Sequence, residues 1–513
     1  MRSTERECSL AGVRRTAFLA VAVLLAGAAS CGDDSEPATD PAKALSYMPA
    51  EPALLAILDT DVDGDQVESF EQAVGENVLG ERDVESILEE IVAGSGVSYD
   101  DDVKPLLGAP LVAAIEDERT FAGREPGSFP IIAIDVADED KLRGVLDKVP
   151  EVDDYARVDD GTLLFSENRQ VLDAARTRHE RGDGLDPAAV DAAMRGLPDD
   201  ALVKLYADVD DGLMLLPELA PLTKMPWFDS VTTLGAAISF EDSQMRLEAL
   251  LSTEGARAED LPVAFGTSDA PEIVERDGWI SGANVNQSQT TTFLLRTVRA
   301  AFPDSDFVRD VATVERERGI DFEREFLRQF DGPSQSLLAP DGRFAARSEV
   351  RDPKRLAETM EKIAPDLGRL VEDLQALRSS GLGILLLLAP DAPAATSVLD
   401  SANVQVRPIG RDLYRMSGLE GPGPDRIVFG LVDDVFVVAE HERAAAEIAA
   451  APTEPFEGPP GPAVMRASGT ALRDAAANLI GIGDDGLPAR EVSASLEAAP
   501  DGLRARIVAE FGD

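Results

Sequence analysis

An acidic run in the first part of the chain has residue types that bind calcium. It reads DTDVDGDQVESFE over residues 59–71. Four of its residues match the start of an EF-hand loop, namely Asp59, Asp61, Asp63 and Gly64. The match then fails, because Phe70 takes the place of the bidentate glutamate. We favour capping of the following helix over calcium binding. No metal site is therefore predicted, and the candidate ligands for one are Asp59, Asp61, Asp63 and Asp65.

Catalytic motifs give little further signal. The chain has two histidines, His179 and His441, and both stand at ends of expected helices, as surface or capping residues rather than as general bases or zinc ligands. Ser-x-x-Lys, Gly-x-Ser-x-Gly, Walker and His-Glu-x-x-His patterns do not occur. A hydrolase that uses a pair of carboxylates stays open, because 96 acidic residues always allow some pair. We predict no catalytic residue and no cofactor.

Cys31 is the candidate for covalent modification. An apolar run at 16–29 follows Arg14 and Arg15, and it ends in Ala28-Ala29-Ser30-Cys31, which resembles a bacterial lipobox. Cys8 lies in the part that would be removed, so the mature chain would keep one cysteine at its start, where a thioether-linked lipid explains it. Ordinary cleavage with an incidental Cys31 is the alternative.

The segments around Cys31 predict a location outside the cytoplasm. Residues 1–30 read as a signal peptide, and residues 31–42 read as a flexible tether. Arg14 and Arg15 leave open whether the general or the twin-arginine route is used. The membrane, contacted through the lipid, is the first expected partner.

Charge excludes one class of partner. Lys and Arg total 48 against 96 Asp and Glu, which gives a formal charge of -48. Phosphate backbones would meet like-charge repulsion, so nucleic acid is ruled out as a partner. The hydrophobic content, 44%, is high enough for two or more cored domains.

The elements that would position these residues occur twice. When the sequence is aligned with itself at an offset of 223 residues, Gly96 pairs with Gly319. Three apolar helix positions also pair with three others: Val84, Leu88 and Ile91 with Phe307, Val311 and Val314. The same offset lays Asp61 and Asp63 over Asn284 and Asn286. After a deletion, Ile134 pairs with Ser348. We infer a tandem duplication, with one copy at 43–255 and the second at 265–511.

A joint between a long and a short helix occurs in both copies. Gly96 and Gly319 stand where the long helix stops, in a place that favours left-handed backbone. Ser98 and Asp321 can cap the short helix that follows. Pro105 should kink the short helix of the first copy.

Each copy is predicted to be an α+β domain with a mixed, mainly antiparallel sheet and helices packed on one face. The expected strands are at 54–58, 111–115, 130–136, 162–166, 344–350, 426–432 and 434–440, with hairpins at 236–251 and 494–509. The second copy carries an insertion near 364–410, whose run GLGILLLLAP is too short to span a membrane and favours a buried strand.

Two stretches carry a family resemblance. LSYMPAEPALLAILDTDVDGDQ at 45–66 and SYDDDVKPLLG at 98–108 resemble the bacterial family of domain of unknown function 3352. The resemblance covers most of the chain after the signal, and its most specific motifs lie in the first copy. It implies a secreted or lipid-anchored protein, mostly of actinobacteria, and it implies no activity, since that family has none assigned.

These observations predict an extracytoplasmic, lipid-anchored, non-catalytic protein that binds or scaffolds at the cell envelope. A carrier of a small apolar ligand and an unrecognised hydrolase are the alternatives. The partner is an envelope protein or an apolar ligand, and the oligomeric state is open. A specific site is expected in one copy or in the groove between the two, and we favour the groove because tandem domains often bind there.

Overall fold

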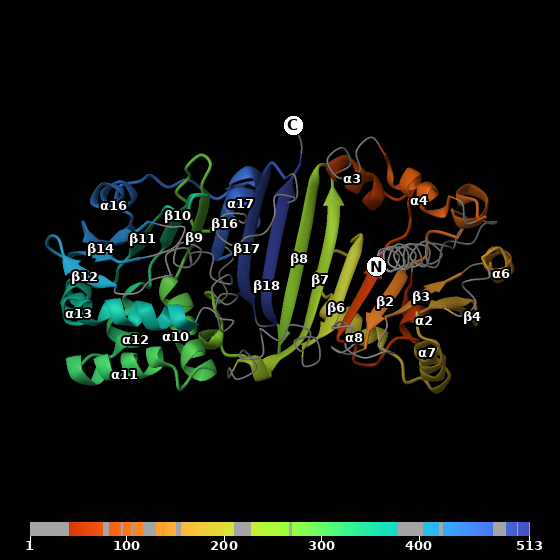
Figure 1. The fold of residues 1–513 in the computed structure, drawn as a ribbon, viewed down its shortest axis with the longest axis horizontal. Coiled ribbons are helices and arrows are strands. Elements are labelled where there is room, and N and C mark those ends of the chain that lie inside the picture. Colours follow the sequence, from red (N-terminus) through yellow and green to blue (C-terminus); the bar gives the residue numbers. More distant parts are fainter. Residues whose placement is uncertain are drawn as a thin grey trace, which may run out of the picture. The chain divides into compact units, whose positions relative to one another are not determined.

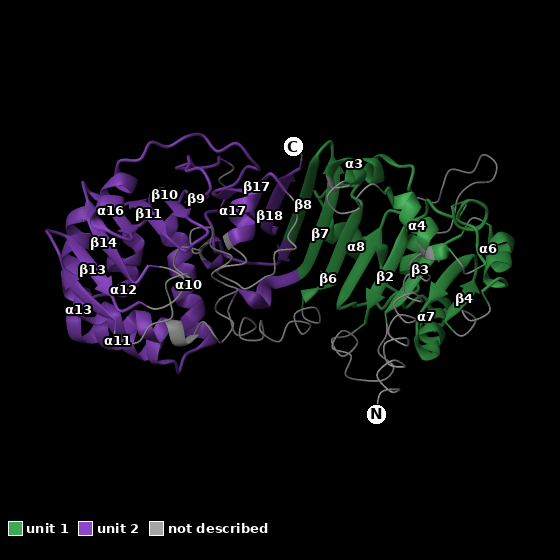
Figure 2. Ribbon diagram, turned by 45° about the horizontal axis from the view of Figure 1, so that its top comes forward, with its two compact units in different colours: residues 1–216, 233–250 green, residues 217–232, 251–513 purple. Residues whose placement is uncertain are grey.

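The protein is described by a computed structural model in which the chain forms two compact units (Figures 1 and 2). The described residues are 40–74, 82–93, 96–104, 106–116, 130–136, 138–149, 155–209, 227–265, 269–377, 404–419, 424–475, 489–499 and 501–511. Unit 1 comprises residues 1–216 and 233–250, and unit 2 comprises residues 217–232 and 251–513. The signal segment, Cys31 and most of the predicted tether lie outside the described residues.

Unit 1 is built on an antiparallel sheet with the order β4-β5-β3-β2-β1-β6-β7. The strands are β1 (Leu54–Leu58), β2 (Leu111–Ile115), β3 (Ile131–Asp135), β4 (Ala156–Asp159), β5 (Thr162–Phe165), β6 (Val203–Asp208) and β7 (Val231–Glu241). A turn at residues 242–243 leads from β7 to β8 (Gln244–Thr253). The predicted strands at 54–58 and 111–115 coincide with β1 and β2.

Helices cover both faces of this sheet. They are α2 (Ala42–Leu45), α3 (Asp65–Val74), α4 (Val84–Val92), the π-helix η2 (Tyr99–Val103), α6 (Glu139–Leu146), α7 (Arg169–Arg181) and α8 (Pro187–Ala193). On one face Leu142 of α6 packs in a core with Leu111 and Ile134. On the other face Leu172 of α7 and Val190 of α8 belong to a second core.

The prediction of helices on one face was therefore wrong for unit 1. The strands offer apolar residues to both sides, as in IIAID of β3, whose first four residues are all buried. A strand that is apolar on both sides needs cover on both sides, because exposed apolar area is unfavourable in water. The α+β class with an antiparallel sheet is confirmed.

Unit 2 has an antiparallel sheet with the order β12-β13-β14-β15-β11-β10-β9-β16-β17-β18. Its strands are β9 (Ile280–Asn284), β10 (Ser334–Leu338), β11 (Phe344–Glu349), β12 (Gln405–Pro408), β13 (Leu413–Ser417), β14 (Arg426–Val432), β15 (Val435–Ala439), β16 (Ala463–Ser468), β17 (Glu491–Ala499) and β18 (Gly502–Glu510).

The helices of unit 2 also lie on two sides of the sheet. They are α10 (Gln287–Ala301), α11 (Asp306–Arg318), α12 (Phe322–Glu325), α13 (Pro353–Leu377), α16 (Glu442–Ala449) and α17 (Gly469–Ala475), with short 3-10 turns at Phe228–Ser230, Ala258–Asp260 and Leu327–Gln329. Figure 1 shows α10, α12 and α13 on one side of β10 and β11 and α16 on the other. Ile448 of α16 packs on Leu337 and Val437.

The two units share their strand connectivity. The order β14-β15-β11-β10-β9-β16-β17 repeats the order β4-β5-β3-β2-β1-β6-β7, and unit 2 adds β12 and β13 at one edge. Register agrees as well, because Leu111 pairs with Ile134 in unit 1 and Ser334 pairs with Ser348 in unit 2. This agreement supports the tandem duplication.

The joint that the sequence repeats has related geometry in both units. Gly96 and Gly319 have φ of 85° and 64°, in the left-handed region. Gly319 ends α11 as predicted, but α4 already ends at Val92, so the prediction that the helix stops at Gly96 was wrong. Ser98 accepts a hydrogen bond from the N–H of Asp101, and Asp321 accepts one from Arg324, so both cap as predicted. The short helix is π-helical in unit 1, and in unit 2 it is an α-turn followed by a 3-10 turn. Pro105 lies outside the described residues.

Two expectations need adjustment. Asn284 is the last residue of β9, whereas Asp61 lies in the loop at 59–64 between β1 and α3, so the offset of 223 does not hold there. The corresponding loop of unit 2 spans only 285–286, so a difference in loop length shifts the pairing. The expected insertion begins inside α13, which runs through Pro365 to Leu377. The run GLGILLLLAP lies outside the described residues.

Candidate ligand-binding site

The acidic loop of unit 1 is organised by local hydrogen bonds. The N–H of Asp61 donates to Oδ1 of Asp59 at 3.0 Å, and the N–H of Asp63 donates to Oδ1 of Asp61 at 3.2 Å. Asp63 also accepts from Nζ of Lys104 at 3.4 Å. Asp65 is the first residue of α3. These bonds turn the loop into the helix, and no group of three or more metal-binding side chains occurs within the described ranges.

Asp61→Asn with Asp63→Asn tests whether calcium uses this loop. Because asparagine keeps the side-chain oxygen that makes the turn, we expect folding to be intact and the free energy of unfolding to change by about 1 kcal/mol or less. Thermal unfolding with and without millimolar calcium measures this. Asp199→Asn with Asp200→Asn, in an exposed turn, is the control. A calcium-dependent rise in melting temperature that only the loop variant loses would contradict the capping interpretation.

The two histidines have structural contacts. His441 precedes α16, and its Nδ1 accepts a hydrogen bond from the N–H of Ala444 at 2.9 Å. Asn168 caps α7 in the same way in unit 1. His179 stacks on Tyr47 with ring centroids 4.2 Å apart, and its Nδ1 lies 2.7 Å from Oγ of Ser46. His179 is thus a packing residue as well as a surface one.

A cavity of about 350 Å³ lies in unit 2 between the sheet and the helices α10 and α13. The helices contribute Gln287, Thr291, Val371 and Leu374. The sheet contributes Ser334, Ser336, Phe344, Ala346, Ser348, Met416, Ile427, Phe436 and Val438. Phe330, at the end of the joint, also lines the cavity and packs on Phe436 with centroids 4.9 Å apart and the rings tilted by 60°. A concave, mainly apolar space with a few polar groups is the usual form of a small-molecule site.

The same place in unit 1 is filled. Register pairs Ser334 with Ser348, and it pairs their counterparts Leu111 and Ile134 with each other. Leu111 and Ile134 are buried in a continuous core with Leu142 of α6. Small hydroxyl residues replace large aliphatic ones in unit 2, which leaves the space open. The two units therefore differ at the floor of the cavity.

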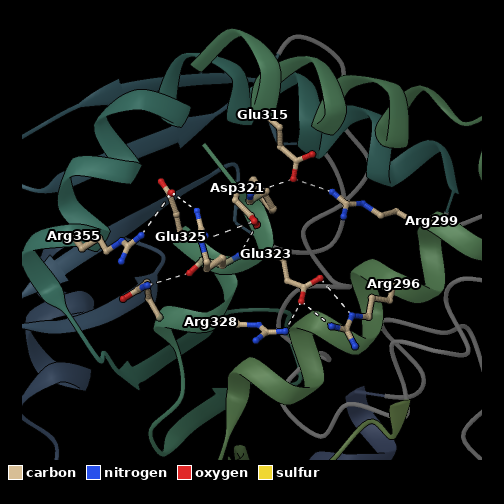
Figure 3. A network of polar contacts seen from close by, with 11 residues as sticks. Arg296, Arg299, Glu315, Asp321, Glu323, Glu325, Arg328 and Arg355 are labelled. Carbon is tan, nitrogen blue, oxygen red and sulfur yellow. Dashed lines mark hydrogen bonds and ion pairs between the residues drawn. The ribbon is translucent and has the colours of Figure 1, made fainter. Parts of the chain in front are cut away.

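An ion-pair network lies at the joint of unit 2 (Figure 3). Glu323 of α12 accepts hydrogen bonds from Arg296 of α10 at 2.8 Å and from Arg328 at 2.7 Å. Burial alone would raise the pKa of Glu323, but these two guanidinium groups outweigh it and hold the pKa below its usual value. Arg299 of α10 pairs with Glu315 of α11 at 3.0 Å. The network ties α10 to α11 and α12.

A carboxyl pair lies between α11 and α13. Asp373 of α13 interacts with Asp310 of α11, and Asp310 also pairs with Arg369 at 2.6 Å. Burial, then the hydrogen bond and charge of Asp310, raise the pKa of Asp373 to about 6. Asp306 adds negative charge nearby. Two carboxyl groups in contact hold one proton more tightly than separate groups do.

Asp373→Asn is expected to raise the melting temperature at pH 7.5 and to leave it almost unchanged at pH 4. The folded state binds the proton of Asp373 more tightly than the unfolded state, whose pKa is about 4, so the stability of the native protein falls as pH rises from about 4 to about 6. Asparagine has no such proton to lose, so the melting temperature of the variant at pH 7.5 should exceed that of the unmodified protein by an amount on the order of 2 °C. Thermal melts across this pH range measure it.

Glu317→Gln, an exposed change on α11, is the matched control for the lost charge. If both variants shift the melting curve equally at pH 7.5, net charge explains the effect. A parallel pH dependence in Asp373→Asn and the unmodified protein would also contradict the shared-proton interpretation.

Comparisons with known proteins do not place the chain in a family. No protein-family model matches it, and no curated protein matches it. A solved structure described as "Structure of crystal form I of TP0453" is 11% identical, with 43% of this chain and 82% of that chain covered and a TM-score of 0.23. That TM-score is too low to argue a shared fold. The resemblance to domain of unknown function 3352 stays a prediction.

Sequence reasoning missed the cavity. The stretch SQSLL, now β10, was not among the expected strands, because its polar residues hide the alternation of a buried strand. The alignment of the two copies did contain a signal for the cavity, because it pairs Ile134, a core residue, with Ser348, a small polar residue. The expected site between the copies stays a prediction.

Proposed function

We propose that this protein is a membrane-anchored, non-catalytic carrier that binds a small apolar ligand in the cavity of unit 2, outside the cytoplasm. The observation that carries the proposal is the difference between two copies of one fold. Unit 1 packs Leu111 and Ile134 at the position where unit 2 keeps Ser334 and Ser348 around an open space. Open apolar space costs stability, so its presence in one copy favours a use for it.

The chemistry of the lining favours binding over catalysis. The lining residues include no histidine, cysteine, lysine, aspartate or glutamate. Its serines therefore have no adjacent base to activate them as nucleophiles. The proposed carrier holds its ligand without reacting with it.

The described surface favours a carrier over a scaffold. Among the described residues, the large apolar side chains that are exposed are Leu234 and Phe265. Protein-docking faces are usually marked by a contiguous exposed apolar patch. The apolar area available for recognition is thus inside unit 2 rather than on its surface.

The place of action follows from Cys31, which we propose carries the lipid. None of the helices in the described ranges has the length and apolar character that a bilayer crossing requires. A lipid on Cys31 would hold both units beside the membrane. A carrier in that position could exchange its ligand with the bilayer.

Binding can be tested with the full-length protein purified from membranes and stripped of bound lipid. N-phenyl-1-naphthylamine is a neutral apolar fluorophore, and we expect it to bind saturably at one site, with a dissociation constant in the range of about 1–100 μM. Mass spectrometry of a solvent extract of the untreated protein should show a small apolar compound in a ratio near one per chain. Fluorescence that rises without saturation, together with an empty extract, would refute the proposal.

A further inference from the structure

The cavity has one polar wall and one apolar wall. The polar wall comes from α10, β10 and β11 and carries Gln287, Thr291, Ser334, Ser336 and Ser348. The apolar wall adjoins the polar one on the same sheet, because Phe436 and Val438 of β15 pair with Ser348 and Ala346 of β11. Ile427 and Met416 continue it farther along the sheet, and Val371 and Leu374 of α13 add to it. A molecule that fills the space therefore meets hydroxyl and amide groups on one side and hydrocarbon on the other.

Among the described lining residues, no charged group points into the cavity. Arg347 contributes to the lining, but it stands between Ala346 and Ser348 on β11, and alternate residues of a strand face opposite sides. Its guanidinium donates instead to the main-chain oxygens of Ile448, Ala449 and Ala451, at the end of α16 on the far side of the sheet. A charged ligand group placed in the cavity would be desolvated without a partner, which is costly.

The polar wall contains an unpaired hydroxyl. Ser348 is 6% exposed, and its Oγ has no hydrogen-bond partner. The neighbouring Ser334 is different, since its Oγ donates to Oε1 of Gln287 at 3.2 Å. A serine side chain moves between three staggered rotamers, so the hydroxyl of Ser348 can turn toward the cavity. A buried polar group without a partner costs roughly 1–3 kcal/mol, and a ligand acceptor would relieve that cost.

We infer that the ligand is an uncharged single-chain amphiphile, in which an ester, amide or hydroxyl group bonds to the serine wall and a hydrocarbon chain lies against α13 and β13–β15. The inference rests on the proposed carrier function and specifies its ligand. The volume of about 350 Å³ is near the lower end of the roughly 300–1,000 Å³ of ligand pockets, which fits one chain rather than a two-chain lipid.

A competition series with one chain length tests the ligand class. N-phenyl-1-naphthylamine bound to the full-length protein is displaced at pH 8 by methyl laurate, lauryl alcohol, laurate or dodecyltrimethylammonium. The two neutral compounds are kept below their solubility limits and the two ions below their micelle concentrations. We expect the ester and the alcohol to compete at least about tenfold better than either ion, because desolvating an unpaired charge costs more than 1.4 kcal/mol.

Ser348→Ala separates the hydroxyl from the apolar space. It removes the hydroxyl without filling the cavity, so we expect affinity for methyl laurate to fall about threefold to tenfold while affinity for the fluorophore is unchanged. Ser417→Ala is the control, since Ser417 lies on β13 next to Met416 and faces the other side of the sheet.

The outcomes distinguish this inference from the function on which it rests. The ligand class would be overturned if laurate competed as well as its methyl ester. It would also be overturned if Ser348→Ala and the unmodified protein bound the ester with equal affinity. In both cases, binding of the fluorophore would still support a carrier. Failure of the fluorophore itself to bind would overturn the carrier function and the ligand class with it.

Discussion

Ser348→Ile is expected to weaken ligand binding in unit 2 strongly while leaving the protein folded. The substitution copies Ile134, which occupies the corresponding position in unit 1 and is fully buried there. The isoleucine side chain would extend into the space that the ligand needs. Forcing both into one volume costs roughly 1–3 kcal/mol, so affinity should fall about tenfold or more. Titration with N-phenyl-1-naphthylamine measures this loss.

The same variant should be at least as stable as the unmodified protein without ligand. Each buried methylene contributes about 0.8 kcal/mol, and the unpaired hydroxyl of Ser348 disappears. Adding Ser334→Leu copies the unit 1 pair completely, although it also removes the hydrogen bond to Gln287. Ser417→Ile is the matched control, because it adds the same side chain on the opposite face of the sheet. Full binding by Ser348→Ile would show that the cavity is not the site.

Cys31→Ser should move the protein from the membrane fraction to the medium. Cys31 is the only cysteine that would remain after signal removal, and a serine at this position cannot carry a thioether-linked lipid. No helix in the described part of the chain is long and apolar enough to cross a bilayer. Cell fractionation with immunoblotting measures the change, which should approach a complete redistribution.

Cys8→Ser is the control, since Cys8 lies in the segment that would be removed. It should stay with the membrane, as the unmodified protein does. Continued membrane association of Cys31→Ser with a processed N-terminus would eliminate lipidation at this cysteine. That result would leave the cavity proposal intact, because the binding experiments do not depend on the anchor.

Local sequence signals determined part of the elements, namely the apolar strands, the helix caps and the joint. Strands such as LLAIL and RIVFGLV were found with the observed bounds, because short β-rich apolar runs between turn residues have few alternative structures. Gly319 and the caps at Ser98 and Asp321 were found because each requirement is local, namely left-handed backbone or a free helix N–H. The duplication itself could be inferred from spacing.

Tertiary structure decided what lies on each face of the sheets. The run IIAID indicates that β3 needs cover on both sides, but the sequence could not show which helices supply it, because an apolar run has no information about which neighbour covers it. The cavity depends on Ser334 and Ser348, which are adjacent only after β10 pairs with β11. Their hydroxyls look like ordinary surface residues in the sequence, whereas burial beneath α10 and α13 makes them a polar wall. Binding space arises from packing over long distances in the chain, and no local pattern encodes it.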